Sequence, residues 1–145
     1  MLELIKLVSL PIVALGAIAG ADVSALSDAI ASPREFTQVG QYGVGEDSAA
    51  EIIASNGQVL AYTNSDKGSV DFVNISDPSN PTAIISVDVG GEPTSVAIRD
   101  GYAVAAVNTS SSFTNPSGKV VVIEMWDYKV VKEIALAGQP DAVSI

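Results

Sequence analysis

The hydrophobic pattern beyond residue 45 consists of short apolar runs separated by turn residues, and it lacks the periodicity of a helix. The runs are rich in β-branched and small residues, which favour strands. In the second half of the chain they predict strands at 94–98, 102–108, 119–125 and 130–136. Asp100-Gly101 predicts a tight turn between the first two of these strands. The pattern therefore indicates an all-β domain.

The strand pattern is repeated along the chain. Residues 91–98 (Gly-Glu-Pro-Thr-Ser-Val-Ala-Ile) return 47 residues later as 138–145 (Gly-Gln-Pro-Asp-Ala-Val-Ser-Ile), and a weaker copy starts at Gly45. A fixed period of this size, with four short strands in each unit, is typical of the blades of a β-propeller. A β-sandwich is the alternative, but it would not require the regular return of the Gly-x-Pro corner.

The repeat divides the folded part of the chain, 36–145, into segments. We expect one four-stranded blade at 45–90, a second at 91–137 and the start of a third at 138–145, while 36–44 form an outer strand without a blade of its own. Propellers close with about four to eight blades. The sequence therefore predicts a partial propeller from a longer protein, whose remaining blades are the expected partners. The bare faces of two isolated blades would make such a fragment marginally stable and prone to associate.

The first 21 residues have the pattern of a secretory signal peptide. Residues 7–18 are almost wholly apolar, and small residues follow at the expected cleavage sites, although Glu3 and the single basic residue Lys6 depart from the pattern. An uncleaved anchor is the alternative, but the apolar run is short of the about 20 residues that span a membrane. Residues 22–35 then form a flexible leader. We expect a periplasmic or extracellular protein with no stable membrane span after cleavage.

The charge balance narrows the range of partners. The chain carries 17 acidic and 7 basic residues, which gives a net charge of −10. Phosphate backbones and anionic lipid surfaces repel such a chain, so neither nucleic acid nor an anionic membrane is an expected partner. The surplus of carboxylates is compatible with divalent cations, and equally with solubility alone.

Several kinds of catalytic site are excluded by composition. The chain has no His and no Cys. It therefore contains no Ser-His-Asp triad, no imidazole base, no thiolate nucleophile and no His or Cys metal ligand. Gly43-Val44-Gly45 lacks the Lys-Ser/Thr pair and the helix of a phosphate-binding loop. Carboxylates, hydroxyls, amides and a few basic groups remain.

The carboxylates have one informative placement. Asp47, Glu92 and Asp141 all belong to corners that join one blade to the next, and Glu51 lies on an inner strand from which it can point into a central channel. Repetition would gather these oxygen ligands near the propeller axis, and Ca²⁺ takes six to eight oxygens. The four residues are therefore candidate metal ligands. The alternative is that they are solvated turn residues.

Two further features lie outside the strands. Residues 110–118 form a long polar loop, about six residues longer than its counterpart in the first unit, which is either functional or a tolerated insertion. Trp126 and Tyr128 flank Asp127 in a turn, where we expect them to cap the outer edge of the sheet.

Several of these motifs carry a family resemblance. They are 62–66 (Tyr-Thr-Asn-Ser-Asp), 72–78 (Phe-Val-Asn-Ile-Ser-Asp-Pro), 89–97 (Val-Gly-Gly-Glu-Pro-Thr-Ser-Val-Ala), 107–110 (Val-Asn-Thr-Ser), 116–119 (Pro-Ser-Gly-Lys) and 138–141 (Gly-Gln-Pro-Asp). From Phe36 to Ile145 the chain resembles the N-terminal propeller of secreted bacterial proteins named for esterase-like activity of phytase. Those proteins are often labelled alkaline phosphatases and are related to choice-of-anchor propellers and to surface-layer and LVIVD repeats.

The resemblance implies hydrolysis of phosphate esters or other esters by the longer protein, with Ca²⁺ as an implied cofactor and a phosphoester as an implied substrate. No catalytic motif of these relatives falls within this chain, so its catalytic residues stay unknown. The turn 125–128 (Met-Trp-Asp-Tyr) also departs from the Val-Asp-Leu turn usual in them. Two hypotheses therefore follow. The chain is the non-catalytic N-terminal propeller part of a secreted phosphoester hydrolase, or it belongs to a non-catalytic extracytoplasmic propeller that binds a partner.

Overall fold

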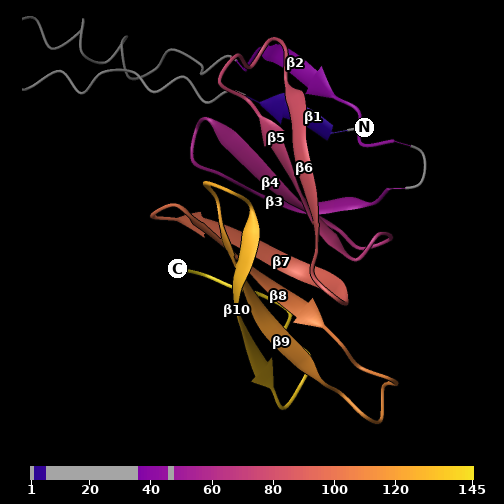
Figure 1. Cartoon of the computed structure of the whole chain (residues 1–145). Coiled ribbons are helices and arrows are strands. Elements are labelled where there is room, and N and C mark those ends of the chain that lie inside the picture. Colours follow the sequence, from indigo (N-terminus) through magenta and orange to yellow (C-terminus); the bar gives the residue numbers. More distant parts are fainter. Residues whose placement is uncertain (1, 6–35, 46–47) are drawn as a thin grey trace, which may run out of the picture.

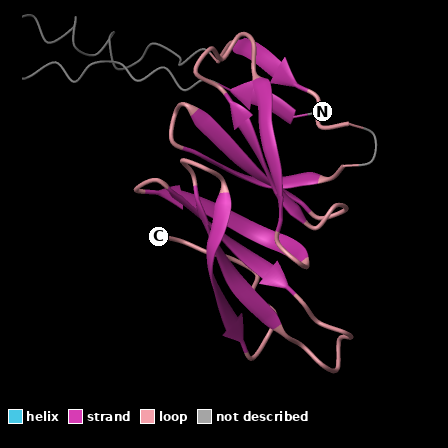
Figure 2. Ribbon diagram, viewed as in Figure 1, coloured by secondary structure: helices cyan, strands magenta, loops and turns pink. Residues whose placement is uncertain are grey.

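The computed structural model describes residues 2–5, 36–45 and 48–145, and every regular element in these ranges is a β-strand (Figure 2). The strands form a two-stranded sheet and two four-stranded antiparallel sheets, which follow one another along the chain (Figure 1). The prediction of an all-β, propeller-like fold built from two four-stranded units is thereby confirmed.

The first four-stranded sheet has the order β3-β4-β5-β6. Its strands are β3 (Ala50–Ser55), β4 (Val59–Asn64), β5 (Ser69–Asn74) and β6 (Thr82–Asp88). A turn at Asn56-Gly57 joins β3 to β4, and Gly57 adopts a positive φ of 91° there. The Oδ1 atom of Asn56 accepts hydrogen bonds from the backbone N–H groups of Gln58 and Val59 at 3.0 and 2.9 Å. Local side-chain chemistry thus closes the first hairpin.

The second four-stranded sheet has the order β10-β9-β8-β7. Its strands are β7 (Glu92–Arg99), β8 (Tyr102–Asn108), β9 (Gly118–Glu124) and β10 (Lys129–Leu136). The four strands expected from the sequence lie at these places. The turn between β7 and β8 has φ values of 50° at Asp100 and 82° at Gly101. Two successive positive φ values are what a two-residue hairpin turn requires.

The two sheets share one hydrophobic core, which forms where β7 packs against β3, β4 and β5 (Figure 1). Small side chains from β4 and β8 allow the sheets to approach closely, and branched side chains from β5, β7 and β9 fill the space between them. The buried members of this core are Ala61, Val70, Phe72, Val87, Val89, Val96, Ala103, Ala105, Val107, Val121, Ile123 and Met125.

An aromatic contact joins the two sheets. The ring of Phe72, which is 1% exposed, lies 4.9 Å from the ring of Tyr128, centroid to centroid, with the planes tilted by 58°. Tyr128 has a positive φ of 57° in the turn between β9 and β10, and its side chain packs against the shared core. Tyr128 therefore does not cap the outer edge of the sheet as expected. Trp126, two residues earlier, is 76% exposed.

The segment after β10 lies against the second sheet much as the start of β7 lies against the first. A Cβ atom placed on Gly68 would lie 3.0 Å from the carbonyl oxygen of Gly91, and one on Gly118 would lie 2.8 Å from that of Gly138. The Oγ1 atom of Thr94 donates to the carbonyl oxygen of Pro140 at 2.7 Å. The stacking of the first repeat on the second thus begins again at residues 138–145.

The N-terminal strands form a small sheet of their own. β2 (Gln38–Tyr42) pairs antiparallel with β1 (Leu2–Ile5), and the residues that follow β2 cover the face of the first sheet turned away from the second. The buried residues on that face are Leu60, Tyr62, Val73 and Ile75, and Tyr42, Val44 and Ala50 pack against them. β1 lies within the predicted signal peptide, 1–21. The rest of that segment and the leader, 22–35, lie outside the described residues, so the cleavage of a signal peptide stays a prediction.

We predict that replacing Phe72 with Ala lowers the free energy of unfolding by about 3–5 kcal/mol, because it leaves a cavity where the two sheets meet. Chemical denaturation at neutral pH measures the change. Trp126→Ala removes a large aromatic side chain from an exposed position and should change stability by less than about 0.5 kcal/mol. Equal losses in the two variants would contradict a core shared by both sheets.

Candidate functional site

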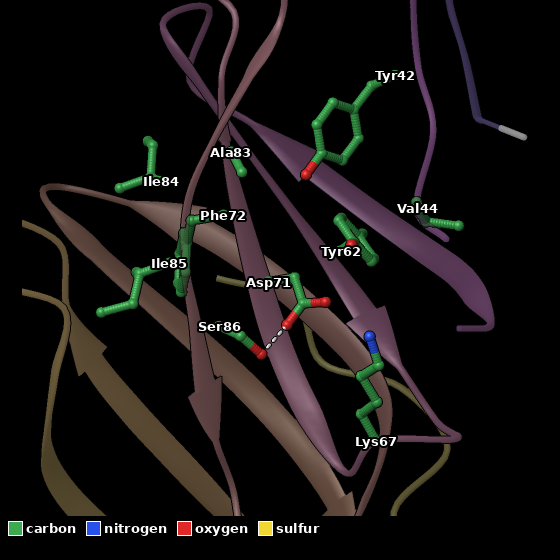
Figure 3. Close-up of a pocket in the computed structure, with 10 residues that line it drawn as sticks. All are labelled: Tyr42, Val44, Tyr62, Lys67, Asp71, Phe72, Ala83, Ile84, Ile85 and Ser86. Atoms are coloured by element: carbon green, nitrogen blue, oxygen red, sulfur yellow. Dashed lines mark hydrogen bonds between the residues drawn. The ribbon is translucent and has the colours of Figure 1, made fainter. Parts of the chain in front are cut away.

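A buried carboxylate lies at the centre of the first sheet. Asp71, in the middle of β5, is 8% exposed. Its Oδ2 atom accepts a hydrogen bond from Asn64 Nδ2 at 2.9 Å, and its Oδ1 atom accepts one from Ser69 Oγ at 2.8 Å. Ser86 Oγ also donates to Oδ1, and Figure 3 draws this bond. Three strands therefore supply donors to one carboxylate.

Strand register explains why these side chains meet. Tyr62 of β4 is the pairing partner of Asp71, which in turn pairs with Ser86 of β6. Asn64 and Ser69 form the next same-face pair along β4 and β5. Directly paired residues project from the same face of a sheet, as do residues two apart on one strand. The pairing of β4, β5 and β6 thus gathers the polar groups on one face.

The hydrogen bonds determine the charge state of the cluster. Burial acts to raise the pKa of Asp71, but hydrogen bonds from Asn64, Ser86, Ser69 and Tyr62 outweigh it and hold the pKa below its ordinary value of 3.8. Burial, together with the hydrogen bond to Asp71, raises the pKa of the Tyr62 hydroxyl well above its ordinary value of 10.0. At neutral pH, Asp71 is therefore an anion and Tyr62 a neutral donor.

An open hollow of about 200 Å³ lies beside this cluster (Figure 3). It extends from the end of β2 and the segment that follows, across β4 and β5, to β6. Its lining residues are Tyr42, Val44, Tyr62, Lys67, Asp71, Phe72, Ala83, Ile84, Ile85 and Ser86. Two aromatic hydroxyls, one ammonium group and one carboxylate therefore face a hollow that is also lined by aliphatic side chains.

The role of Asp71 is structural, because its carboxylate is occupied by hydrogen bonds from its own sheet. A carboxylate has about four lone-pair positions for hydrogen bonds, and Asp71 has four donors around it. Its lowered pKa also makes it a poor proton acceptor near neutral pH. Asp71 therefore holds β4, β5 and β6 in register.

The predicted metal ligands are exposed where the structure describes them. Glu51 lies on β3, Glu92 begins β7 and Asp141 lies beyond β10. Glu92 Oε2 accepts a hydrogen bond from Asn108 Nδ2 at 3.0 Å. Asp47 lies outside the described residues. Within the described ranges, no group of three or more acidic side chains could hold a metal ion. The described residues alone do not fit a Ca²⁺ site, and such a site at these four positions stays a prediction.

Asp71 was not among the residues that the sequence suggested. The available signal was a charged residue within the apolar run of β5, two residues after Ser69. A charged residue in the middle of a strand that is otherwise buried must find partners. The sequence does not identify those partners, because Asn64 and Ser86 lie on other strands.

The comparison with family models matches residues 50–145, from the first residue of β3 to the last residue of the chain, to the choice-of-anchor I domain. The chain belongs to the choice-of-anchor I domain family. Searches of curated proteins and of solved structures found no match. Asn64, Ser69, Asp71 and Ser86 lie within the matched range, whereas Tyr42, which lines the hollow, precedes it.

Membership of the choice-of-anchor I family indicates a surface-associated, extracytoplasmic β domain. None of the described residues belongs to a helix long and apolar enough to cross a membrane.

We predict that Asp71→Ala destabilises this choice-of-anchor domain at pH 7 by about 1–3 kcal/mol, because it leaves the donors of Asn64 and Ser69 buried without an acceptor. The folded-state pKa lies below the ordinary 3.8, so the ionised carboxylate stabilises the fold above about pH 4, and this contribution is lost as the pH falls through the folded-state pKa. The deficit of Asp71→Ala should therefore shrink in acid.

Denaturant unfolding at pH 7 and at pH 3 measures this difference. Asp66→Ala removes an exposed carboxylate from the turn after β4 and serves as the matched control, with little effect expected at either pH. A deficit of the same size at both pH values would contradict an ionised, hydrogen-bonded Asp71.

Proposed function

We propose that this chain supplies blades of an extracytoplasmic β-propeller that acts as a non-catalytic binding and structural domain. The observation that carries the proposal is the repeated stacking of one unit on the next. The start of β7 packs on the first sheet, and residues 138–145 take up a similar position on the second. In a β-propeller, each blade packs on the one before it in this way.

The exposed face of the second sheet supports further stacking. On that face, the register places Val120 of β9 between Ala106 of β8 and Ile134 of β10, and Tyr102 lies on the same side of β8. Tyr102 is 40% exposed and Ile134 is 48% exposed. Apolar side chains in this arrangement suit the packing of another sheet. We propose that further blades cover this face.

Three features support a non-catalytic role. The sequence has neither His nor Cys. The buried carboxylate of Asp71 is occupied by donors from its own sheet. The exposed carboxylates of Glu51, Glu92 and Asp141 form no metal-binding group within the described residues. Structural hydrogen bonding and surface recognition therefore account for these polar groups better than acid–base or metal chemistry does.

Hydrolysis of a phosphoester by a longer, phytase-like protein is the second candidate function. Its support is the motif resemblance between residues 62 and 141. In that case, the catalytic groups and any Ca²⁺ ligands would lie mainly on further blades, and this chain would contribute the scaffold. The proposed location, periplasmic or extracellular, is the same for both candidates.

We predict that the purified chain does not hydrolyse an aryl phosphate above background, with or without added Ca²⁺. A chromogenic assay at micromolar protein concentration measures this. Turnover that disappears in Glu51→Gln or Glu92→Gln would overturn the non-catalytic proposal, because it would place the catalytic groups in this chain.

We also predict that Gly118→Ala displaces residues 138–145 from the second sheet. A Cβ atom at this position would lie 2.3 Å from Pro140 Cδ and 2.8 Å from the carbonyl oxygen of Gly138. The amide of Val143, which donates to Ser95 Oγ at 3.2 Å, should then exchange with solvent faster in a hydrogen-exchange measurement. Gly138→Ala is the matched control, because its Cβ atom would meet nothing within 4 Å. Unchanged exchange at Val143 in Gly118→Ala would contradict the stacking.

A further inference from the structure

The loop between β8 and β9, residues 109–117, presents one aromatic side chain directly to solvent. Phe113 lies at its tip with an exposed fraction of 105%, the largest among the exposed large hydrophobic residues of the described chain. The loop projects beyond the ends of its two strands (Figure 1). In the first sheet, the corresponding connection between β4 and β5 is a short turn of four residues, 65–68, with no aromatic side chain.

Hydrogen bonds close this loop on itself at its base and near its tip. At its base, the N–H of Thr109 donates to the carbonyl oxygen of Ser117 at 3.1 Å, and the N–H of Ser117 donates to Ser110 Oγ at 3.0 Å. Near its tip, the N–H of Asn115 donates to the carbonyl oxygen of Ser112 at 3.1 Å. The loop is therefore a closed hairpin. A binding loop that is already ordered loses less conformational entropy when it binds.

The chemistry around Phe113 is uncharged and rich in hydroxyl groups. Residues 109–117 contain no acidic or basic side chain, although the whole chain carries a net charge of −10. The side chains nearest to Phe113 in sequence are those of Ser111, Ser112, Thr114 and Asn115. The loop thus combines one flat apolar side chain with hydroxyl and amide groups adjacent in sequence, which can both donate and accept hydrogen bonds.

We propose that this loop binds a neutral polysaccharide, with the ring of Phe113 stacked on the C–H face of a sugar unit. A pyranose ring has the complementary surface, because its apolar C–H face is bordered by hydroxyl groups. The polar groups next to Phe113 already bond one another: Ser112 Oγ lies 3.2 Å from Thr114 Oγ1, and Asn115 Nδ2 donates to Ser111 Oγ at 2.9 Å. Each hydroxyl and amide keeps further donor and acceptor positions, and these would bond the hydroxyl border of the sugar. The inference rests on the proposed binding function and specifies the ligand class. The family assignment is compatible with it, because a surface-associated domain meets cell-surface glycans.

The same observations disfavour other ligands. A net charge of −10 repels anionic polysaccharides and anionic lipids. Insertion into a neutral bilayer, or into an apolar pocket of another protein, would favour a cluster of apolar side chains, whereas the neighbours of Phe113 in the loop are polar. A single exposed aromatic ring in an uncharged loop rich in hydroxyl side chains suits sugar stacking best.

The test measures retention of the purified chain on insoluble cellulose, chitin and starch, and its retardation in gels that contain mannan or dextran. We expect at least one of these neutral polymers to bind the chain, while alginate, an anionic polymer, does not. Phe113→Ala should weaken that binding about tenfold or more, as expected when one well-formed contact of about 1.4 kcal/mol is removed. Phe113→Trp should retain the binding because it keeps an aromatic face.

Two further variants separate stacking from simple hydrophobicity. Phe113→Leu keeps an apolar side chain but loses the flat ring, so it should bind as poorly as Phe113→Ala. Phe36→Ala removes another exposed phenylalanine, 61% exposed and outside the loop, and should bind like the unchanged chain. Circular dichroism should show the same folded spectrum for all four variants.

The proposal is overturned if none of the five neutral polymers binds, or if Phe113→Ala binds as well as the unchanged chain. It is also overturned if Phe113→Leu retains the binding, or if the chain binds phosphatidylcholine vesicles through Phe113 instead, because apolar insertion then explains the exposed ring. Polysaccharide binding that survives Phe113→Ala would leave the proposed binding function in place and remove only its assignment to this loop. Hydrolysis in the aryl phosphate assay would instead count against the non-catalytic function.

Discussion

The structure depends on the apolar contact between β7 and the first sheet. A single antiparallel sheet of four short strands buries only one face well, and such sheets need a partner layer for stability. Here each sheet supplies that layer to the other. The small side chains of Ala61, Ala103 and Ala105 bring the layers together, and Phe72 and Tyr128 fill the remaining space.

The two sheets have the same strand order but different chemistry on their other faces. Asn64 pairs with Ser69 in the first sheet, and Asn108 pairs with Gly118 in the second. Asp71 lies two residues after Ser69 on β5, and Val120 lies two residues after Gly118 on β9. Val120 therefore occupies the position in the second sheet that Asp71 has in the first. The neighbouring strand then places Ile134 where Ser86 lies in the first sheet. The first sheet therefore has the hydrogen-bonded Asp71 cluster beneath the segment after β2, whereas the corresponding face of the second sheet has apolar side chains suited to packing.

This division of roles is consistent with a choice-of-anchor domain in which the sheets serve as the scaffold. Strand pairing and core packing use the backbone and most of the apolar side chains, so recognition falls to the connections between strands. The β8–β9 connection departs most from its counterpart in the first sheet, because it is longer and has its own hydrogen bonds. A loop of this kind can vary without disturbing the core beneath it.

The sequence by itself determined the strands of the second sheet, the turn at Asp100-Gly101 and the repeat, because alternation and turn chemistry are local properties. It did not determine the candidate site. Asp71 stood out only as a charge within an apolar strand, and its donors come from strands whose register depends on the whole sheet. Tyr128 was expected at an outer edge but packs beside Phe72, because the stacking of two sheets decides which face of a turn is buried. The corner carboxylates recur at corresponding points of the repeat, but the sequence could not determine whether they share a metal ion, because distance in space is decided by tertiary packing.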